Sequence, residues 1–286
     1  MDHFESQFAG HGGLELYAQY WLPEGEVRAI LALVHGFGEH CGRYGNVVDW
    51  FVPRGYAVTG MDMRGMGRSP GPRGHINDWE ELREDVTAFL RWSQARVPDA
   101  PLFLVGHSQG ALIALEYAQH DPDGLAGIVA SGPTLGRLPV SPMMVVLAKL
   151  LSRVWPRFTQ DVKLDATALS RDPKVPAAYR DDPLVHGMAT ARLGTEIMAA
   201  IDRVNAHAGD LSLPCLIVHG GADRFGPAEA TRAFCDHITF PDTQRIEYEG
   251  YYHEVFNDVG KEKVLADVEA WIVRHTPVSA YADQQQ

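Results

Sequence analysis

The pentapeptide Gly106-His107-Ser108-Gln109-Gly110 constrains the fold of this chain more than any other feature. It fits the pattern G-x-S-x-G, in which a serine is raised on a tight turn between a strand and a helix. Glycines on both sides of the serine remove Cβ atoms that such a turn would bring into collision. The apolar run 102–105 precedes the motif and a helical pattern over 111–120 follows it. We therefore predict that Ser108 is a nucleophile rather than a structural serine in a glycine-rich turn.

Short apolar runs alternate with longer amphipathic stretches along most of the chain. We predict strands at 14–22, 29–34, 56–61, 101–105, 125–130, 214–218 and 244–248, and helices at 78–97, 111–120, 227–235 and 261–275. Asp78 and Glu81 form a capping-box pattern at the start of one of these helices. The alternation predicts a mostly parallel sheet covered by helices on both faces. The first runs have no helix between them, which predicts an antiparallel edge.

The alternation of strands and helices fails between residues 132 and 210. This region is rich in proline and helical in pattern, and it contains no convincing strand, so we expect an insertion above the sheet. Within it, residues 140–158 are apolar on most helical faces, with Lys149 and Arg153 on one polar stripe. Two hypotheses follow: this helix is the core of the insertion, or it docks on micelles or membranes. We expect the tail, 276–286, to be disordered.

A nucleophilic serine needs a base, and the base needs an orienting acid, in the chain order serine, acid, histidine for this type of motif. Asp223 follows the strand at 214–218, at the edge of the sheet where such sites lie. His253 lies in a loop between the last strand and the last helix. Other candidates fall within or at the ends of helices: Glu229, Asp236, His237 and His275. We predict a catalytic triad of Ser108, Asp223 and His253.

The oxyanion of an acyl-transfer intermediate needs two backbone N–H donors. One donor is expected from Gln109, the residue after the nucleophile. The second is expected from the loop after the run 29–34, in His35-Gly36-Phe37-Gly38, and we assign it to Phe37. The alternative is that His35-Gly36 only forms a tight turn where the chain leaves the strand.

Composition excludes several classes of function. The formal net charge of −12 argues against nucleic acid as a partner. The three cysteines do not form a disulfide framework, and neither a Cys-x-x-Cys pair nor H-E-x-x-H occurs, so we expect no metal and no cofactor. Residues 1–10 do not resemble a signal peptide, and no run reaches the roughly 18 apolar residues of a membrane span. We expect a cytoplasmic protein, with peripheral membrane contact if the 140–158 helix docks.

Several motifs resemble those of the monoacylglycerol lipase and lysophospholipase family of α/β-hydrolases, of the serine aminopeptidase S33-like (Hydrolase_4) type. They are His35-Gly36-Phe37-Gly38-Glu39-His40 with Arg43-Tyr44, Asp62 to Ser69, Arg73-Gly74-His75, the serine motif, Asp181 to His186, Gly220 to Asp223 and Glu249 to His253. These motifs span about residues 30–275, and the first of them is specific to the family rather than to the fold.

The resemblance implies an eight-stranded α/β-hydrolase core (1–131 and 209–275) with a helical cap (132–208) inserted after the sixth strand. It also implies a tunnel for one acyl chain, with Glu39 and Arg43 near the polar head group. The alternative for these two residues is a surface ion pair four residues apart. Gln109 stands where the family usually has methionine. Phe256 stands where members that recognise glycerol tend to carry a second histidine.

The resemblance favours a serine esterase that acts on single-chain lipids, most directly a monoacylglycerol lipase. Alternatives on the same triad are a lysophospholipase, a small-molecule carboxylesterase and a thioesterase. A non-catalytic binding module on the same fold is disfavoured because all three triad positions are filled. The sequence leaves open the physiological ester, the preferred acyl length, the regiospecificity and the oligomeric state.

Overall fold

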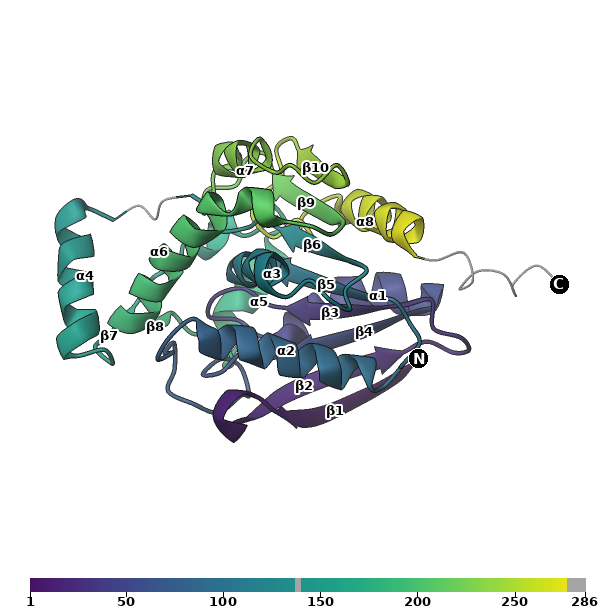
Figure 1. Ribbon diagram of the computed structural model, residues 1–286, viewed down its shortest axis with the longest axis horizontal. Coiled ribbons are helices and arrows are strands. Elements are labelled where there is room, and N and C mark those ends of the chain that lie inside the picture. The colour runs from purple at the N-terminus through teal and green to yellow at the C-terminus, as the bar shows by residue number, and fades with distance from the viewer. Residues whose placement is uncertain (137–139, 277–286) are drawn as a thin grey trace.

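The centre of the molecule is a sheet of eight strands in the order β1-β2-β4-β3-β5-β6-β9-β10 (Figure 1). The computed structural model describes residues 1–136 and 140–276. The strands are β1 (Asp2–Ala9), β2 (Glu15–Leu22), β3 (Ala29–Val34), β4 (Tyr56–Met61), β5 (Leu102–His107), β6 (Gly127–Ser131), β9 (Cys215–Gly220) and β10 (Thr243–Tyr248). β2 is antiparallel to both β1 and β4, and the remaining pairs are parallel. This sheet confirms the predicted α/β-hydrolase architecture.

Helices cover both faces of the sheet (Figure 1). They are α1 (Gly45–Phe51), α2 (Glu80–Gln94), α3 (Gln109–His120), α4 (Pro142–Val154), α5 (Lys174–Asp181), α6 (Ala191–Ala206), α7 (Ala228–Cys235) and α8 (Lys261–His275). Side chains of α2, α3 and α6 pack in one apolar cluster, and those of α1 and α8 in the other. Every residue of β3, β4, β5, β6 and β9 is buried. These strands therefore appear in the sequence as continuous apolar runs.

The ends of several elements differ from the prediction for identifiable reasons. β5 continues to His107 because Gly106 and His107 still pair with β6. α2 is shorter at both ends than the predicted range 78–97. Asp78 accepts a hydrogen bond from the Glu81 N–H at 3.2 Å, but the Glu81 carboxylate binds Asn77 instead of returning to Asp78. The capping box is therefore only half formed.

The first strand, β1, was not predicted. Its residues are exposed or half-buried apart from Phe8, so the sequence lacks the apolar alternation of a half-buried strand. β1 lies at the sheet edge and pairs antiparallel with β2 along its whole length. Backbone pairing with β2 and one buried side chain, Phe8, hold this strand in place, and neither gives a recognisable pattern in the sequence.

The segment between β6 and β9 is mainly helical, and we call residues 132–208 the inserted segment. Contrary to the expectation that it has no strand, β7 (Thr159–Asp161) and β8 (Met188–Thr190) form a small antiparallel sheet. Three-residue strands are too short to give a period in the sequence. α4 spans 142–154 rather than 140–158. It packs beside α6 at the left edge of the view in Figure 1.

The chain terminus after α8 corrects one further expectation. Thr276 is buried, and its hydroxyl donates a hydrogen bond of 2.9 Å to the Ile272 carbonyl, so this residue belongs to the helix end rather than to a disordered tail. The rest of the predicted tail, 277–286, lies outside the described residues. No helix in the described ranges combines the length and apolar character needed to cross a bilayer.

Candidate active site

Ser108 occupies the turn between β5 and α3 with an unusual backbone conformation. Its φ is 54° and its ψ is −113°, and no other non-glycine residue in the described ranges has a positive φ. A Cβ at Gly106 would lie 2.3 Å from the Gly110 carbonyl oxygen, and a Cβ at Gly110 would lie 2.1 Å from the Val34 carbonyl oxygen. Both positions therefore require glycine, and the strained turn lifts the Ser108 side chain above the end of the sheet.

Three predicted residues from separate loops meet at this turn. The His253 Nε2 lies 2.9 Å from the Ser108 Oγ, and the His253 Nδ1 lies 2.6 Å from the Asp223 Oδ2. The other Asp223 oxygen accepts hydrogen bonds from the N–H groups of Phe225, at 2.8 Å, and Gly226, at 3.1 Å. With Nδ1–H donating to Asp223, Nε2 carries the lone pair that can accept the Ser108 proton.

The electrostatics of the trio suit proton transfer from a hydroxyl. Burial acts to raise the pKa of Asp223, but hydrogen bonds from His219 and His253 outweigh it and hold that pKa well below its usual range. Burial lowers the pKa of His253, whereas the hydrogen bond and the charge of Asp223 raise it, and the net shift is upward. The ionised Asp223 thus makes His253 a stronger base.

The other acid and histidine candidates lie elsewhere. Glu229 pairs with Arg232 on the exposed side of α7, and Asp236 follows the end of that helix. The Nδ1 atoms of His237 and His275 each bond a carbonyl of the preceding helical turn, Ala233 at 2.7 Å and Trp271 at 2.7 Å. None of these four side chains contacts Ser108.

The two predicted oxyanion donors border the same space as Ser108. Gln109 opens α3, where the first backbone N–H groups of a helix have no partner within it. Phe37 follows Gly36, at which a Cβ would lie 3.2 Å from the Ser108 Cβ and 2.9 Å from a Glu39 carboxylate oxygen. In the part of the chain that the structure describes, neither the Gln109 nor the Phe37 N–H donates a hydrogen bond.

His35 fixes the loop that carries Phe37, a role that the sequence did not reveal. Its ring is fully buried; Nδ1 donates to the Gly36 carbonyl at 2.7 Å, and Nε2 accepts from the Met63 N–H at 2.9 Å. Burial lowers the pKa of His35, which keeps the ring neutral and able to act as donor and acceptor at once. The loop is thereby tied to the end of the neighbouring strand β4.

Glu39 and Arg43 form an ion pair that is buried rather than on the surface. Glu39 is 4% exposed, and its carboxylate binds Arg43 and accepts hydrogen bonds from the Gly36 N–H at 2.7 Å and the Tyr44 hydroxyl at 2.9 Å. Burial acts to raise the pKa of Glu39, but the charge of Arg43 outweighs it and the pKa falls to about 2. Arg43 also contacts Glu254, with N–O distances of 2.8 and 2.9 Å. No pattern in the sequence indicated a role for Glu254.

A cavity of about 610 Å³ lies between the sheet and the inserted segment, with Ser108 and His253 in its wall. Its lining on the side of the inserted segment is mostly apolar: Val140, Met144, Val145, Leu147, Ala148, Leu151, Phe158, Ile197 and Met198. Glu39, Arg43, Tyr179 and Glu254 also line it. The lining of the cavity thus combines Ser108 with an apolar wall and a group of polar side chains. Phe256 is buried in the core cluster shared with α8 and does not line this cavity.

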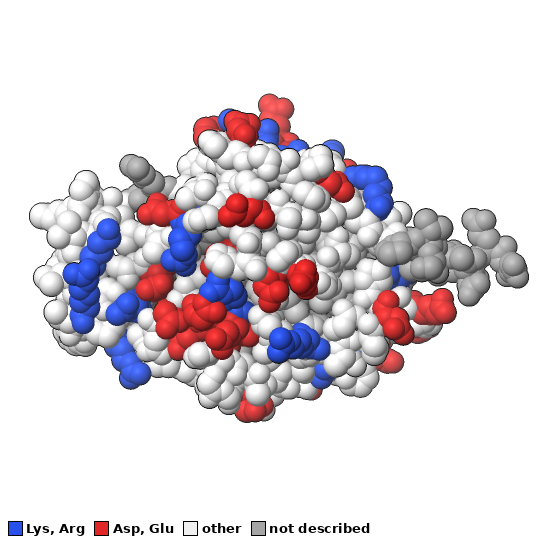
Figure 2. Space-filling model, in the orientation of Figure 1, with Lys and Arg blue, Asp and Glu red and all other residues white. Residues whose placement is uncertain are grey.

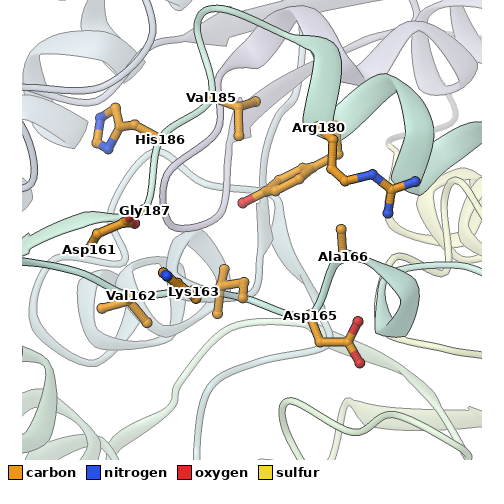
Figure 3. A pocket seen from close by; sticks show the side chains of 11 residues that line it. Asp161, Val162, Lys163, Asp165, Ala166, Arg180, Val185, His186 and Gly187 are labelled. Carbon is orange, nitrogen blue, oxygen red and sulfur yellow. The ribbon is translucent and has the colours of Figure 1, made fainter.

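A second hollow of about 500 Å³ lies within the inserted segment (Figure 3). Figure 3 shows Arg180 and Asp165 at one side of it and His186 at the other. It shares Val162, Leu164 and Tyr179 with the lining of the first cavity. Its lining includes no member of the trio, so the first cavity is the candidate active site.

The outer surface of α4 is apolar and exposed. Ser152 is the only buried residue of the helix, and its hydroxyl lies 2.8 Å from that of Thr195. By contrast, Val146 is 67% exposed and Leu150 is 55% exposed. Trp155, just after the helix, is 60% exposed. Figure 2 shows white surface crossed by a blue stripe over α4, at the left of the view. The exposure contradicts the hypothesis that the whole helix is a core element.

Comparisons with known proteins find similar sequences over most of the chain. A family model described as Hydrolase_4, serine aminopeptidase S33, matches residues 25–260. Over 273 residues the chain is 37% identical to a monoacylglycerol lipase of Mycolicibacterium smegmatis, a match that covers 95% of this chain and 97% of that protein. A monoglyceride lipase of Mus musculus is 32% identical, with 91% and 87% of the two chains covered.

Solved structures of similar proteins superpose over nearly the whole chain. The monoacylglycerol lipase of Paleococcus ferrophilus has a TM-score of 0.81 and 33% identity, and covers 96% of this chain and 100% of its own. A soluble variant of monoglyceride lipase from Saccharomyces cerevisiae, in complex with a substrate analog, has a TM-score of 0.86 and 25% identity, with 95% of each chain covered.

Proposed function

The chain belongs to the Hydrolase_4 family of α/β-hydrolases, and from this membership we propose that it hydrolyses monoacylglycerols to glycerol and a fatty acid. The observation that carries the proposal is the hydrogen-bonded series from Asp223 through His253 to Ser108, opening into a cavity with an apolar wall and polar side chains. Pockets of this size and character suit ligands with a long apolar part and a few polar groups.

The proposed reaction proceeds through an acyl-enzyme. The Ser108 Oγ attacks the ester carbonyl while His253 takes the hydroxyl proton, and the oxyanion is held by the N–H groups of Phe37 and Gln109. The intermediate collapses as His253 gives the proton to the departing glycerol oxygen. Water, deprotonated by His253, then attacks the acyl carbon, and Ser108 regains its proton as the fatty acid leaves.

The orientation of the substrate follows from the lining of the cavity. The acyl chain would lie against α4 and α6, where it replaces contact with water by contact with apolar side chains. The glycerol would lie toward Glu39, Arg43 and Tyr179, where polar groups are available. The same orientation accommodates a lysophospholipid or a simple alkyl ester, so head group and acyl length have to be tested directly.

A hydrolysis screen across head groups and acyl lengths tests the proposed function. Purified enzyme is incubated with monoacylglycerols, lysophospholipids, p-nitrophenyl esters and acyl thioesters that share one acyl chain, and the alcohol or thiol released is quantified. Release of glycerol from monoacylglycerol at the highest kcat/KM is expected. A fluorophosphonate probe should label the wild type but not Ser108→Ala, and no labelling together with no hydrolysis would support a binding module instead.

We further propose that the protein works in the cytoplasm and touches lipid surfaces through α4. All three cysteines are free thiols, as is usual for proteins of reducing compartments. Val146, Leu150 and Trp155 offer apolar surface for contact with lipid, worth some kcal/mol at about 25 cal/mol per Å². Such docking would place the apolar wall of the cavity beside the source of its substrate.

A further inference from the structure

Arg43 lies between two buried carboxylates, those of Glu39 and Glu254, and we call these three residues the charge cluster. The Arg43 Nη1 contacts Glu39 on one side and the Glu254 Oε1, at 2.8 Å, on the other. Its Nη2 donates to the Glu254 Oε2 at 2.9 Å. The guanidinium also lies over the Tyr179 ring, 4.8 Å from the ring centroid. Both carboxylates are nearly inaccessible to solvent.

Neighbouring groups hold Glu254 in this position. Its backbone N–H donates to the Leu169 carbonyl at 2.8 Å, and the Asn257 side chain donates to Oε2 at 2.8 Å. Asn257 is itself bound through Oδ1 by Asn46 at 2.8 Å. Glu254 is therefore a fixed part of the site and follows His253 directly in the chain.

The charge cluster combines two carboxylates with one guanidinium, so its formal charge is −1. Glu39 stays ionised because Arg43 holds its pKa at about 2, although burial alone would raise it. Among the residues that the structure describes, the remaining charged side chain in the cavity lining is Arg224, which is about half exposed and pairs with Asp165 at 3.3 Å. Burial lowers the pKa of His107 to about 3, so this ring is neutral and does not offset the negative charge of the cluster.

We propose that the charge cluster selects substrates by the charge of the leaving alcohol: neutral or cationic alcohols are accepted, and anionic ones are rejected. This inference rests on the proposed function, in which the head group lies beside Glu39 and Arg43. Arg43 is the buried cation of this site that would otherwise bind a phosphate or carboxylate. Its guanidinium is already engaged by two carboxylates, so an anionic head group would meet net negative charge in a site of low dielectric. The site thus favours glycerol esters over anionic lysophospholipids.

Esters that differ mainly in charge test the proposal. The dodecanoyl esters of ethylene glycol, glycolate and choline carry alcohol groups that are neutral, anionic and cationic. Each is assayed as monomer, and its kcat/KM is divided by its rate of alkaline hydrolysis to remove intrinsic reactivity. For the wild type we expect the glycolate ester to be at least roughly tenfold poorer than the ethylene glycol ester, and the choline ester to match or exceed the latter.

A substitution and a change of salt concentration distinguish the effect of the charge cluster on substrate preference from that of the acidic surface. Glu254→Gln keeps the size of the side chain and removes one charge, so the glycolate-to-ethylene-glycol ratio should rise at least about threefold. Glu262→Gln, at an exposed position at the start of α8, is the matched control and should leave the ratio unchanged. Repulsion by the net charge of −12 would fade in 0.5 M NaCl. Discrimination by the buried cluster should persist there.

The outcomes distinguish the two proposals. Equal use of the neutral and anionic esters by the wild type, or a preference that disappears in salt, would overturn charge selection while leaving the esterase in place. An unchanged ratio in folded Glu254→Gln would also overturn it. If the wild type cleaves none of these esters and no monododecanoylglycerol, the proposed function fails and the inference fails with it.

Discussion

The Glu39 Oε1 accepts a hydrogen bond of 2.7 Å from the backbone N–H of Gly36, one residue before the proposed oxyanion donor Phe37. The carboxylate thus holds the loop that would receive the developing negative charge. The same carboxylate also binds Arg43, so it links the loop to the charge cluster. This relationship changes what substitutions at Glu39 are expected to do.

Replacement of Glu39 should impair chemistry on every ester. In Glu39→Ala the Gly36 N–H and Arg43 lose their partner, and we expect kcat to fall by roughly 10- to 100-fold. The fall should be similar for monoacylglycerol and for a p-nitrophenyl ester of the same acyl chain, because both need the oxyanion loop. A rise in KM confined to monoacylglycerol, with kcat unchanged, would instead indicate that Glu39 serves only the head group.

Substitutions in the proposed triad should lower kcat severely, and their effects should not be additive. Ser108→Ala and His253→Ala should each lower kcat by on the order of 10⁴-fold or more, since the residues act as a unit. Asp223→Asn should cost somewhat less. Steady-state kinetics, with circular dichroism to verify folding, measures these effects. Retention of a tenth of the wild-type activity by Ser108→Ala would rule out Ser108 as the nucleophile.

The pH dependence of activity should follow the charges around His253. The Asp223 interactions, together with the negative charges of Glu254 and Glu39, outweigh the effect of burial and raise the pKa of His253. A general base must be unprotonated, so kcat/KM should fall at acid pH as His253 gains a proton. Glu254→Gln removes one of these charges and destabilises the imidazolium. The fall of kcat/KM at acid pH should therefore move to lower pH, by roughly half a unit or more.

A pH profile of kcat/KM on a soluble p-nitrophenyl ester measures that shift. Glu262→Gln serves as the control, because its exposed side chain lies at the start of α8 and not beside the ring. The neutral His107, 4.8 Å from His253 between ring centroids, should not titrate in the accessible range. A shift of this fall in kcat/KM to higher pH in Glu254→Gln would contradict the electrostatic account.

The exposed face of α4 should be needed for substrate presented in micelles or bilayers. Replacing Val146, Leu150 and Trp155 with serine should weaken liposome co-sedimentation and lower activity on micellar monoacylglycerol several-fold, while short soluble esters are spared. The effect should depend little on salt, because the contact is apolar and the net charge is −12. Val259→Ser, an exposed apolar position away from α4, is the control. Normal liposome binding by the triple variant would exclude the docking role.

The parts of this site that the sequence predicted are those with a local signature. Ser108 lies in a motif whose glycines are required by contacts within a few ångströms, and the strands around it are buried on both faces and appear as apolar runs. β1 and the β7–β8 pair were missed because backbone pairing at an edge or over three residues leaves no period. Glu254 was missed because its partner, Arg43, is 211 residues away in the sequence. Only the fold brings that pair together.

The charge cluster also bears on how the reaction ends. The second product of ester hydrolysis is a fatty acid, which ionises at neutral pH while its carboxylate still lies beside Ser108. At that moment the nearby excess of negative charge, which a neutral glycerol ester does not feel, acts on the product. The same residues that accept a neutral glycerol ester therefore repel the carboxylate formed from it. Inhibition by released fatty acid should be weak compared with inhibition by a neutral analogue such as the fatty alcohol of equal length.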